Sequence, residues 1–568
     1  MKRHGKLLTL AVIAAALCLP ALRAEAAVEG YVPQDALAVV KVTDLERHYE
    51  EFANSPLLAH LKDPTFMPEL AEKIREAEGG IREFERAHDV SARDVLMGLL
   101  GREAALAVFS DETGVLVVEA ESEVALRDAV DEFQRVQRLT GDLLDTATSQ
   151  YKGIQVHASE MKDGKTRYHA MSGRALAVSE DRSAVERVID TAAGAAEAMA
   201  DSADFGDAMR MAERGALAVG YVGGAALEAL SEQIRREAEV PGHGHERLVM
   251  RRLAEALPTA RFLMLSVLHE EDVSARVTVA YQGNRLPAGL ARIFPEEGSR
   301  LDVLELAPRN AALVAARSLD SEGSWHSMMD MLREVAPRRA EKTEQVMDML
   351  VNMVGGVYSR EELLAEFTGQ GALMVLPAET QDAPPAAGLV IGLRETAHLP
   401  TAIESIVGAV VTFARAEGKH DVTLNHSEHD GVRLTTVMVD EPGIWARIAP
   451  TFGVVEGTMV VTTSPAAARD VVDTARGAAR IRTPRADGTL FGAGVMNVRT
   501  VSDMLEQYHG FLLRRAMEKD NKPEAQARRE LEALGKLLSL VDSVEFAAAF
   551  GEGRTDHYLR LDLAHDAR

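Results

Sequence analysis

Two stretches of the chain share one pattern of apolar and polar positions. Residues 174–196 and 458–479 each begin with a short apolar or β-branched run that predicts a buried strand. A segment with apolar residues at helical spacing follows in both. These apolar positions are Val185, Val188, Ile189 and Ala192 in the first stretch and Ala468, Val471, Val472 and Ala475 in the second. The pattern predicts a strand that leads into an amphipathic helix, used twice.

The ends of these two helices carry matching signals. Ser179 and Ser464 stand where a side chain would cap the first turn, and Pro465 suits the first helical position of the second copy. Gly194 and Gly477 follow the last turn, where a left-handed residue is favoured. Packing and capping explain every shared position, so the repeated module predicts a duplicated fold and no chemistry.

The same alternation of strand and helix patterns continues along both halves of the chain. In the first half, helices are expected at 45–61, 68–88, 123–139 and 225–237, and strands at 104–109, 114–119, 216–222, 260–268 and 274–281. In the second half, helices are expected at 325–335, 338–354, 399–416 and 501–518, and strands at 372–376, 388–393, 492–498, 542–550 and 557–563. The spacing between matched positions changes only by loop-sized steps, which indicates duplication of the whole unit.

This organisation predicts an α+β fold of two tandem homologous domains, each a twisted, mainly antiparallel sheet with helices packed on one face. The predicted boundaries are a first domain at 27–283, a linker at 284–299 and a second domain at 300–568. Gly and Pro cluster in the linker, between two complete patterns. A connection at 377–387, rich in Ala and Pro, is expected to be an exposed loop.

The first 26 residues predict an export signal. Three basic residues precede an apolar run at 7–22, and Ala24-Glu25-Ala26 forms a cleavage site of small residues. Retention as an anchor is the alternative, although Pro20 interrupts a run that is already short for a membrane span. Cleavage would place the mature protein in the periplasm of a Gram-negative bacterium.

Charge and cysteine content narrow the range of partners. The chain has a net charge of −25, which becomes −28 when residues 1–26, with four basic and one acidic side chains, are removed. A strongly acidic protein lacks the clustered cations that bind nucleic acid or anionic membrane surfaces. The one cysteine, Cys18, lies in the signal, so the mature chain has neither a disulfide nor a cysteine nucleophile. No segment after the signal predicts a membrane span.

Several of these motifs together resemble a family of bacterial exported proteins of unknown function. They are the P-x-[DN]-A-x-x-x-V strand, the S-x-x-[DE]-[VL]-L-x4-G turn, the D-T-A-x-G helix end and the segment Ala200-Asp201-Ser202-Ala203-Asp204-Phe205. The resemblance covers most of residues 31–565, although the second half keeps only Leu490-Phe491 of the last segment. It implies an envelope location and α+β architecture, and it implies no catalytic residue.

Histidines form the most ligand-like clusters. His243, His245 and Glu246 are weak candidates for Zn²⁺ or Cu²⁺, and a Gly-rich loop before a helix at 247–257 explains them equally well. His420, His426 and His429 lie on or beside a predicted strand, where histidine side chains usually face solvent. We therefore expect neither a metal site nor a cofactor.

Methionines are frequent in two predicted helices. They are Met328, Met329 and Met331 in the first helix and Met347, Met349 and Met353 in the second. Thioethers suit Cu(I), but Val346, Leu350 and Met353 form a regular stripe with Met349 that predicts core packing.

The chain contains no recognisable catalytic motif. Ser159 and Lys162 match S-x-x-K, but they lie in a predicted hairpin without the partner motifs of the penicillin-recognising enzymes. Catalytic residues are therefore unknown, and paired carboxylates cannot be identified among so many acids. The leading hypothesis is a non-enzymatic periplasmic scaffold or binding protein, which uses an exposed sheet face or a cleft to bind an envelope protein, a peptide or a cell-wall component. The alternatives are a hydrolase with unmarked carboxylates and a metal-handling protein that uses the His and Met clusters.

Overall fold

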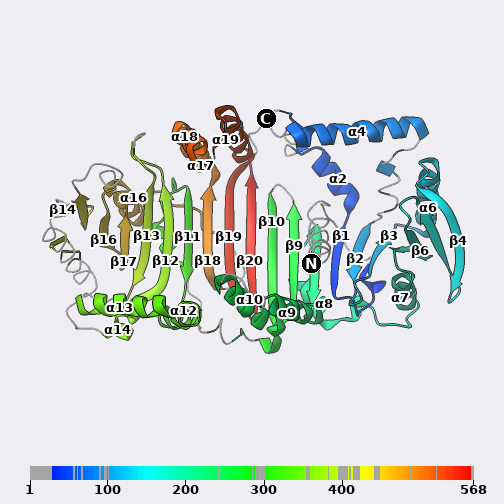
Figure 1. The fold of residues 1–568 in the computed structure, drawn as a ribbon, viewed down its shortest axis with the longest axis horizontal. Helices are drawn as coiled ribbons and strands as arrows, with labels where there is room; N and C mark the ends of the chain where they lie inside the picture. The colour runs from blue at the N-terminus through cyan, green and yellow to red at the C-terminus, as the bar shows by residue number, and fades with distance from the viewer. Residues whose placement is uncertain are drawn as a thin grey trace. The chain divides into compact units, whose positions relative to one another are not determined.

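The computed structural model describes residues 28–564 apart from short stretches, of which the longest are 239–243, 292–300, 354–358, 395–403, 413–421 and 440–447. The predicted signal at 1–26, the helix at 399–416 and the linker at 284–299 lie wholly or mostly outside the described residues. The described part is a mixed α+β structure with antiparallel strands, as the sequence predicts. It divides into two compact units at Gln282 and Gly283, except that residues 242–248 group with unit 2 (Figure 1).

The sheet of unit 1 contains ten antiparallel strands. They are β1 (Ala38–Thr43), β2 (Glu103–Val108), β3 (Gly114–Glu119), β4 (Leu143–Tyr151), β5 (Ile154–Met161), β6 (Thr166–Ser172), β7 (Ala175–Ser179), β8 (Ala218–Gly223), β9 (Ala260–His269) and β10 (Val273–Tyr281). Their spatial order is 4-5-6-7-3-2-1-8-9-10. The pairing of β3 with β7 places the strand of the repeated module inside this sheet.

The helices among residues 28–282 lie on both faces of that sheet. They are α2 (Leu45–Ala53), α4 (Pro68–His88), α6 (Glu123–Leu139), α7 (Arg182–Ala192), α8 (Ala203–Met211), α9 (Gly224–Ala238) and α10 (Gly244–Ala256). Val188 of α7 shares a buried cluster with Val117, whereas Val130 of α6 shares another with Val118. Successive strand residues point to opposite faces, so α6 and α7 cover opposite sides. The prediction of helices on one face is wrong here, because periodicity shows that a helix has an apolar stripe but not which sheet face it covers.

Unit 2 also contains a ten-stranded antiparallel sheet. Its strands are β11 (Leu313–Ser318), β12 (Phe367–Leu376), β13 (Ala386–Leu393), β14 (Val422–His429), β15 (Val432–Val439), β16 (Thr451–Val455), β17 (Thr458–Thr462), β18 (Thr489–Asn497), β19 (Val541–Gly551) and β20 (Arg554–Leu563). Their order is 14-15-16-17-13-12-11-18-19-20. Each place in this order matches the corresponding place in unit 1.

The helices of unit 2 include one stretch that the sequence pattern missed. They are α12 (Ser321–Val335), α13 (Pro337–Met353), α14 (Arg360–Ala365), α16 (Pro465–Ala475), α17 (Val498–Gln507), α18 (His509–Lys519) and α19 (Glu524–Leu538). The single helix expected at 501–518 is divided between α17 and α18, with Tyr508 as the C-cap of α17. Helix α19 is the stretch that was not predicted, because its many charged residues obscure the helical spacing of its apolar residues.

The repeated module has the predicted strand and helix in both units, but the first cap differs from the prediction. Ser464 Oγ accepts the Ala467 amide at 3.2 Å and caps α16, as predicted. Ser179 instead ends β7, where its hydroxyl donates to the Gly114 carbonyl at 2.6 Å, and Asp181 caps α7. The prediction for Ser179 is wrong because β7 extends to this residue.

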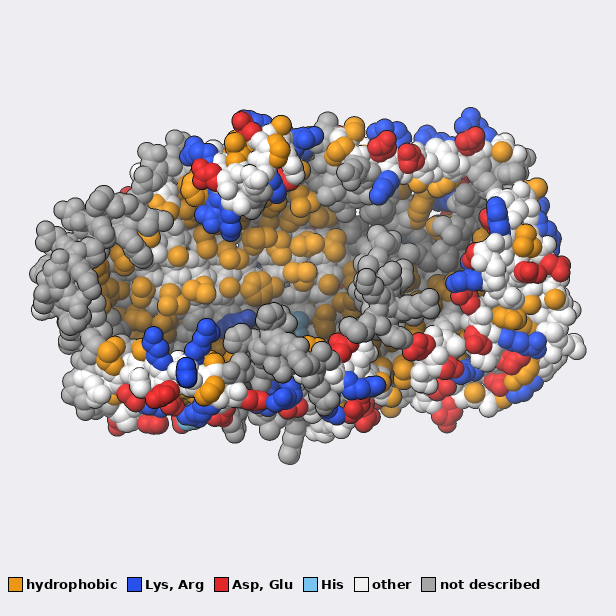
Figure 2. Space-filling model, in the orientation of Figure 1, with side chains coloured by type: hydrophobic (Ala, Val, Ile, Leu, Met, Phe, Trp, Pro, Cys, Tyr) orange, Lys and Arg blue, Asp and Glu red, His pale blue; other side chains and the backbone are white. Residues whose placement is uncertain are grey.

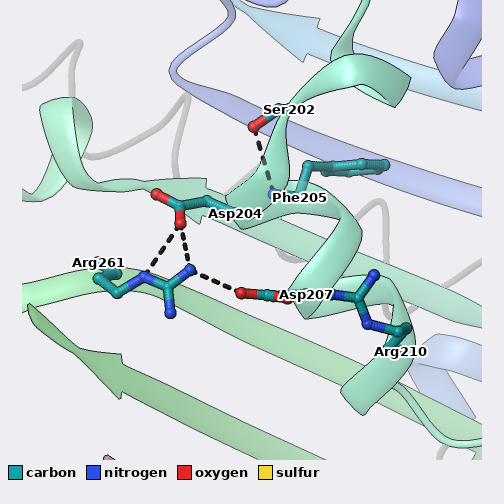
Figure 3. A network of polar contacts seen from close by, with 6 residues as sticks. All are labelled: Ser202, Asp204, Phe205, Asp207, Arg210 and Arg261. Atoms are coloured by element: carbon teal, nitrogen blue, oxygen red, sulfur yellow. Dashed lines mark hydrogen bonds and ion pairs between the residues drawn. The ribbon is translucent and has the colours of Figure 1, made fainter. Parts of the chain in front are cut away.

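The segment Ser202 to Phe205, which unit 2 lacks, anchors α8 to the sheet (Figure 3). Ser202 caps the helix, and the Phe205 side chain is buried. Arg261 on β9 donates from Nε to Asp204 at 3.0 Å and from Nη2 to Asp207 at 2.7 Å. Arg261 is the main cause of the lowered pKa of the Asp207 carboxyl. The segment therefore has a packing role.

Candidate functional site

The structure describes some of the histidine candidates. His245 and Glu246 belong to α10, which begins at Gly244, so the Gly-rich loop expected there is in part helical. His243 and His420 lie outside the described residues, as do the side-chain surroundings of His245 and Glu246. His426 Nδ1 lies 3.0 Å from the Thr435 hydroxyl, and His429 lies against Asp473. Of these histidines, His429 is the one that the structure places beside two carboxylates.

The methionine-rich helices are only partly in the core. Met329 is buried, and Met347 packs with Leu363 and Leu393. Val346 and Met349 are exposed, so the predicted core stripe of α13 is wrong at these two positions. The packed face of α13 instead includes Met347 and Val351. Helix α13 lies beside a larger apolar surface (Figure 2).

That surface, which we call the apolar trough, has a floor formed by one face of the unit 2 sheet. Strand register aligns one residue from each of six neighbouring strands in a row. The row is Leu389, Leu373, Ala315, Gly494, Phe546 and Leu559, and the next row is Ala387, Val375, Leu313, Met496, Val544 and Leu561. Leu373 is 62% exposed and Leu559 is 45% exposed. Large apolar side chains therefore meet solvent in the middle of a sheet, where burial is the usual arrangement.

Helices form the two walls of the trough. Helix α12 follows the end of β11, and α17 follows the end of β18, and these two strand ends lie at opposite edges of the floor because the strands are antiparallel. Figure 2 shows a hollow lined by hydrophobic side chains, with α12 and α13 on one side and α17, α18 and α19 on the other. The wall helices carry exposed apolar side chains, namely Met328, Met331, Val346, Met349, Phe511, Met517, Leu534 and Leu537. Floor and walls together offer a concave apolar surface.

A second apolar site lies in unit 1, under α6. A cavity of 280 Å³ is lined mainly by apolar side chains of α6 and of strands β3, β5 and β7. Its polar lining residues are Gln134, Gln137, Ser159, Arg167 and His169. Gln134 Nε2 lies 3.1 Å from His169 Nε2, and the His169 ring stacks on His157 with centroids 4.8 Å apart. An apolar cavity with a few convergent polar groups is the usual form of a small-molecule site.

A polar cavity of 390 Å³ occurs in unit 2 beside the loop that follows β12. Pro377, Ala378 and Glu379 of this loop line it together with residues of α16 and His429. The loop is held by Tyr508, whose hydroxyl donates to the Ala383 carbonyl at 2.6 Å. Burial raises the pKa of the Asp470 carboxyl, and nearby Asp473 raises it further. This is one acid of the kind that the hydrolase alternative requires, and that alternative remains a prediction.

Comparison with known proteins adds one finding. Residues 96–246 match a family model described as protein of unknown function, DUF3352. The match includes α6 and the cavity beneath it, and it ends before the trough begins. No curated protein matches the chain, and no solved structure does. Among the helices that the structure describes, none is both long and apolar enough to cross a bilayer.

The sequence analysis missed the trough, although the sequence contains a signal for it. A strand of an antiparallel sheet with one solvated face alternates apolar and polar residues. The runs Ala372–Leu376 and Phe546–Phe550 are apolar at consecutive positions. Such runs predict that both faces are apolar, and only the fold shows that one of the faces is left open.

Proposed function

We propose that the protein is a non-enzymatic exported binding protein that holds the acyl chain of a lipid in the apolar trough of unit 2. The observation that carries this proposal is the floor of the trough, where Leu313, Leu373, Phe546 and Leu559 on four of the six paired strands are exposed. Covering this surface removes apolar area from water, which stabilises a complex by about 25 cal/mol per Å². Because this surface is apolar and exposed, an apolar ligand that covers it forms the most stable complex.

The pairing of the floor strands favours an acyl chain over an extended peptide. A peptide that adds to a sheet needs an edge strand with free backbone groups. Strands β11, β12, β13, β18 and β19 are paired on both sides, so five of the six floor strands offer no such edge. A peptide lying across this floor would bury its own polar groups without partners, at a cost of about 1 to 3 kcal/mol each. An acyl chain has no such groups.

The dimensions and the charges of the trough also suit a lipid. Six strands at about 4.8 Å spacing give a floor roughly 24 Å across. This exceeds the length of an acyl chain in one leaflet, which is about half of a hydrocarbon core of about 30 Å. Arg338 and Arg339 on α13 and Arg514 and Arg515 on α18 are exposed on the wall helices. These guanidinium groups provide partners for a phosphate or carboxylate headgroup.

The test is binding of a fluorescent fatty-acid analogue and its displacement by unlabelled long-chain fatty acid. We expect saturable binding by the full chain and at least tenfold weaker binding by Leu373→Gln, because the amide places a polar group in the middle of the floor. Leu144→Gln is the matched control, since Leu144 is a strand leucine of unit 1 that is 61% exposed, compared with 62% for Leu373.

Four outcomes would contradict the proposal. One is equal weakening by Leu373→Gln and Leu144→Gln, and another is probe binding that fatty acid does not displace. The third is saturation of the trough by an unfolded polypeptide but not by lipid, which would indicate a chaperone. Formation of dimers that must dissociate before the probe binds would likewise contradict the proposal, because a second copy of the chain would then occupy the surface.

The proposal includes the export and duplication inferred from the sequence. The features of residues 1–26 support a cleaved signal and a periplasmic location, and N-terminal sequencing of the exported protein checks the expected start at Ala27. Matching strand order in the two units supports two tandem homologous domains. The acidic charge supports a partner other than nucleic acid.

A further inference from the structure

One hairpin turn occupies the same place in both units. Lys152 and Gly153 join β4 to β5, and Asp430 and Gly431 join β14 to β15. All four residues have positive φ angles, 46° and 87° in unit 1 and 47° and 75° in unit 2. Tyr151 pairs with Ile154, and His429 pairs with Val432, at the first step after each turn. Lys152 and Asp430 are therefore equivalent, as are Tyr151 and His429.

In unit 1 this turn supplies a cation to a carboxylate on the repeated helix. Asp190 lies near the end of α7, and its Oδ1 is 2.7 Å from the Lys152 ammonium nitrogen. The Tyr151 hydroxyl donates to Asp190 Oδ2 at 3.2 Å. The carboxylate of Asp190 is thus neutralised by the protein itself.

In unit 2 the carboxylate is kept but the cation is replaced by an acid. Asp473 has the place in α16 that Asp190 has in α7, and its Oδ1 is 2.6 Å from His429 Nε2. One ligand atom each from His429, Asp430 and Asp473 lies within 4.8 Å of the other two. The position of Lys152 is therefore filled by a carboxylate that faces another carboxylate.

A second position of the repeated helix, three residues before Asp190 and Asp473, also changes from a cation in unit 1 to a carboxylate in unit 2. Arg187 of unit 1 bonds Asp111, and its counterpart in unit 2 is Asp470. Asp470 lines the polar cavity with Asp473, Glu379 and Arg469, and the closest N–O distance between Arg469 and Glu379 is 3.7 Å. Two cations of unit 1 are thus two carboxylates in unit 2. Like charges held close together destabilise a fold unless a cation joins them.

We propose that unit 2 binds a divalent transition-metal ion between His429, Asp430 and Asp473, at the place where unit 1 holds the Lys152 ammonium. One imidazole and two carboxylates form a ligand set that fits Zn²⁺, with water in a fourth position. Ca²⁺ and Mg²⁺ prefer sites made wholly of oxygen ligands. The adjoining cavity of 390 Å³ leaves room for that water. This site does not depend on lipid binding in the trough.

Calorimetric titration of the untagged, chelator-treated full chain with ZnCl₂ tests the site. We expect one tight equivalent for the natural chain and a rise in Tm on adding Zn²⁺. The double variant His429→Tyr with Asp430→Lys copies the residues of unit 1, so its turn is compatible with folding. We expect it to bind Zn²⁺ at least 30-fold more weakly and to lose the Zn²⁺-dependent rise in Tm.

Two further variants separate this site from others. His243→Ala with His245→Ala removes the candidates near α10 and is expected to leave the affinity unchanged. Tyr151→His with Lys152→Asp is expected to add a second equivalent of Zn²⁺, because it gives unit 1 the ligands of unit 2. Unchanged binding by the His429→Tyr and Asp430→Lys variant would overturn the proposal. Absence of binding to the natural chain, or loss of binding with the His243 and His245 variant, would overturn it as well.

Discussion

His169 illustrates how the environment of one residue makes the stability of the fold depend on pH. Its side chain is buried among the apolar residues of the cavity under α6, and Gln134 and His157 are its polar neighbours. Burial, with a smaller contribution from the charge on His157, lowers the pKa of His169 to about 4. The folded protein therefore keeps this imidazole neutral at pH values where an unfolded chain would protonate it.

This difference predicts a loss of stability in acid. Between about pH 6.5 and pH 4 the unfolded state binds more protons at His169 than the folded state, so the free energy of unfolding decreases as the pH falls through this window. The contribution amounts to at most about 3 kcal/mol by pH 4. Urea unfolding of unit 1 at pH 7.5 and pH 4.5 should show a smaller decrease for His169→Gln than for the natural chain. A decrease of equal size in both, with the same decrease in the control His426→Gln, would refute the assignment.

At the scale of elements, the repeated module shows that matching sequences need not use matching caps. Strand β7 includes Ser179, so the cap moves to Asp181, whereas Pro465 fixes the start of α16 directly after Ser464. Gly194 and Gly477 have φ angles of 69° and 107° after the two helices, as their sequence position predicts. The C-terminal glycines are therefore equivalent, while the N-caps are not.

The cap of α16 gives a prediction at this scale. Ser464→Ala removes the acceptor for the Ala467 amide and should lower the free energy of unfolding by about 1 kcal/mol. Ser464→Asn supplies another acceptor and should restore most of the loss. Chemical denaturation of unit 2 measures both. If the alanine and asparagine variants are equally destabilised, packing of Ser464 rather than capping accounts for the effect.

At the scale of the whole molecule, each unit has its own buried clusters. Val188 of α7 lies in a cluster formed by residues of unit 1, and Val471 of α16 lies in the corresponding cluster of unit 2. Both side chains are almost fully buried. A cavity at either position should therefore destabilise the unit that contains it.

Hydrogen exchange of the full chain tests this independence. Val188→Ala and Val471→Ala each remove two methyl groups from a core and should cost on the order of 2 kcal/mol. We expect faster exchange in strands β1–β10 for the first variant and in strands β11–β20 for the second. Faster exchange throughout the chain in both variants would mean that the units unfold together.

Much of the local structure could be predicted from the sequence, because it depends on neighbouring residues. The helices Pro68–His88 and Glu123–Leu139 have the predicted bounds, and the strand Gly114–Glu119 does as well. Ser359 and Glu362, the Ser and the acid of the S-x-x-[DE] motif in the second half, form the two reciprocal hydrogen bonds of a capping box. Periodicity and capping act over a few residues, so one sequence suffices to recognise them.

The candidate sites depend on contacts between distant residues, and for this reason the tertiary structure alone revealed them. His429 and Asp473 are 44 residues apart and meet because α16 packs on the sheet that begins with β14. The trough exists because six strands align their apolar residues and the helices cover only the ends of that face. The sequence by itself determined the charge, the elements and their repetition. Strand order and the choice of covered face required the fold, because alternation along a strand does not say which of its two faces will be buried.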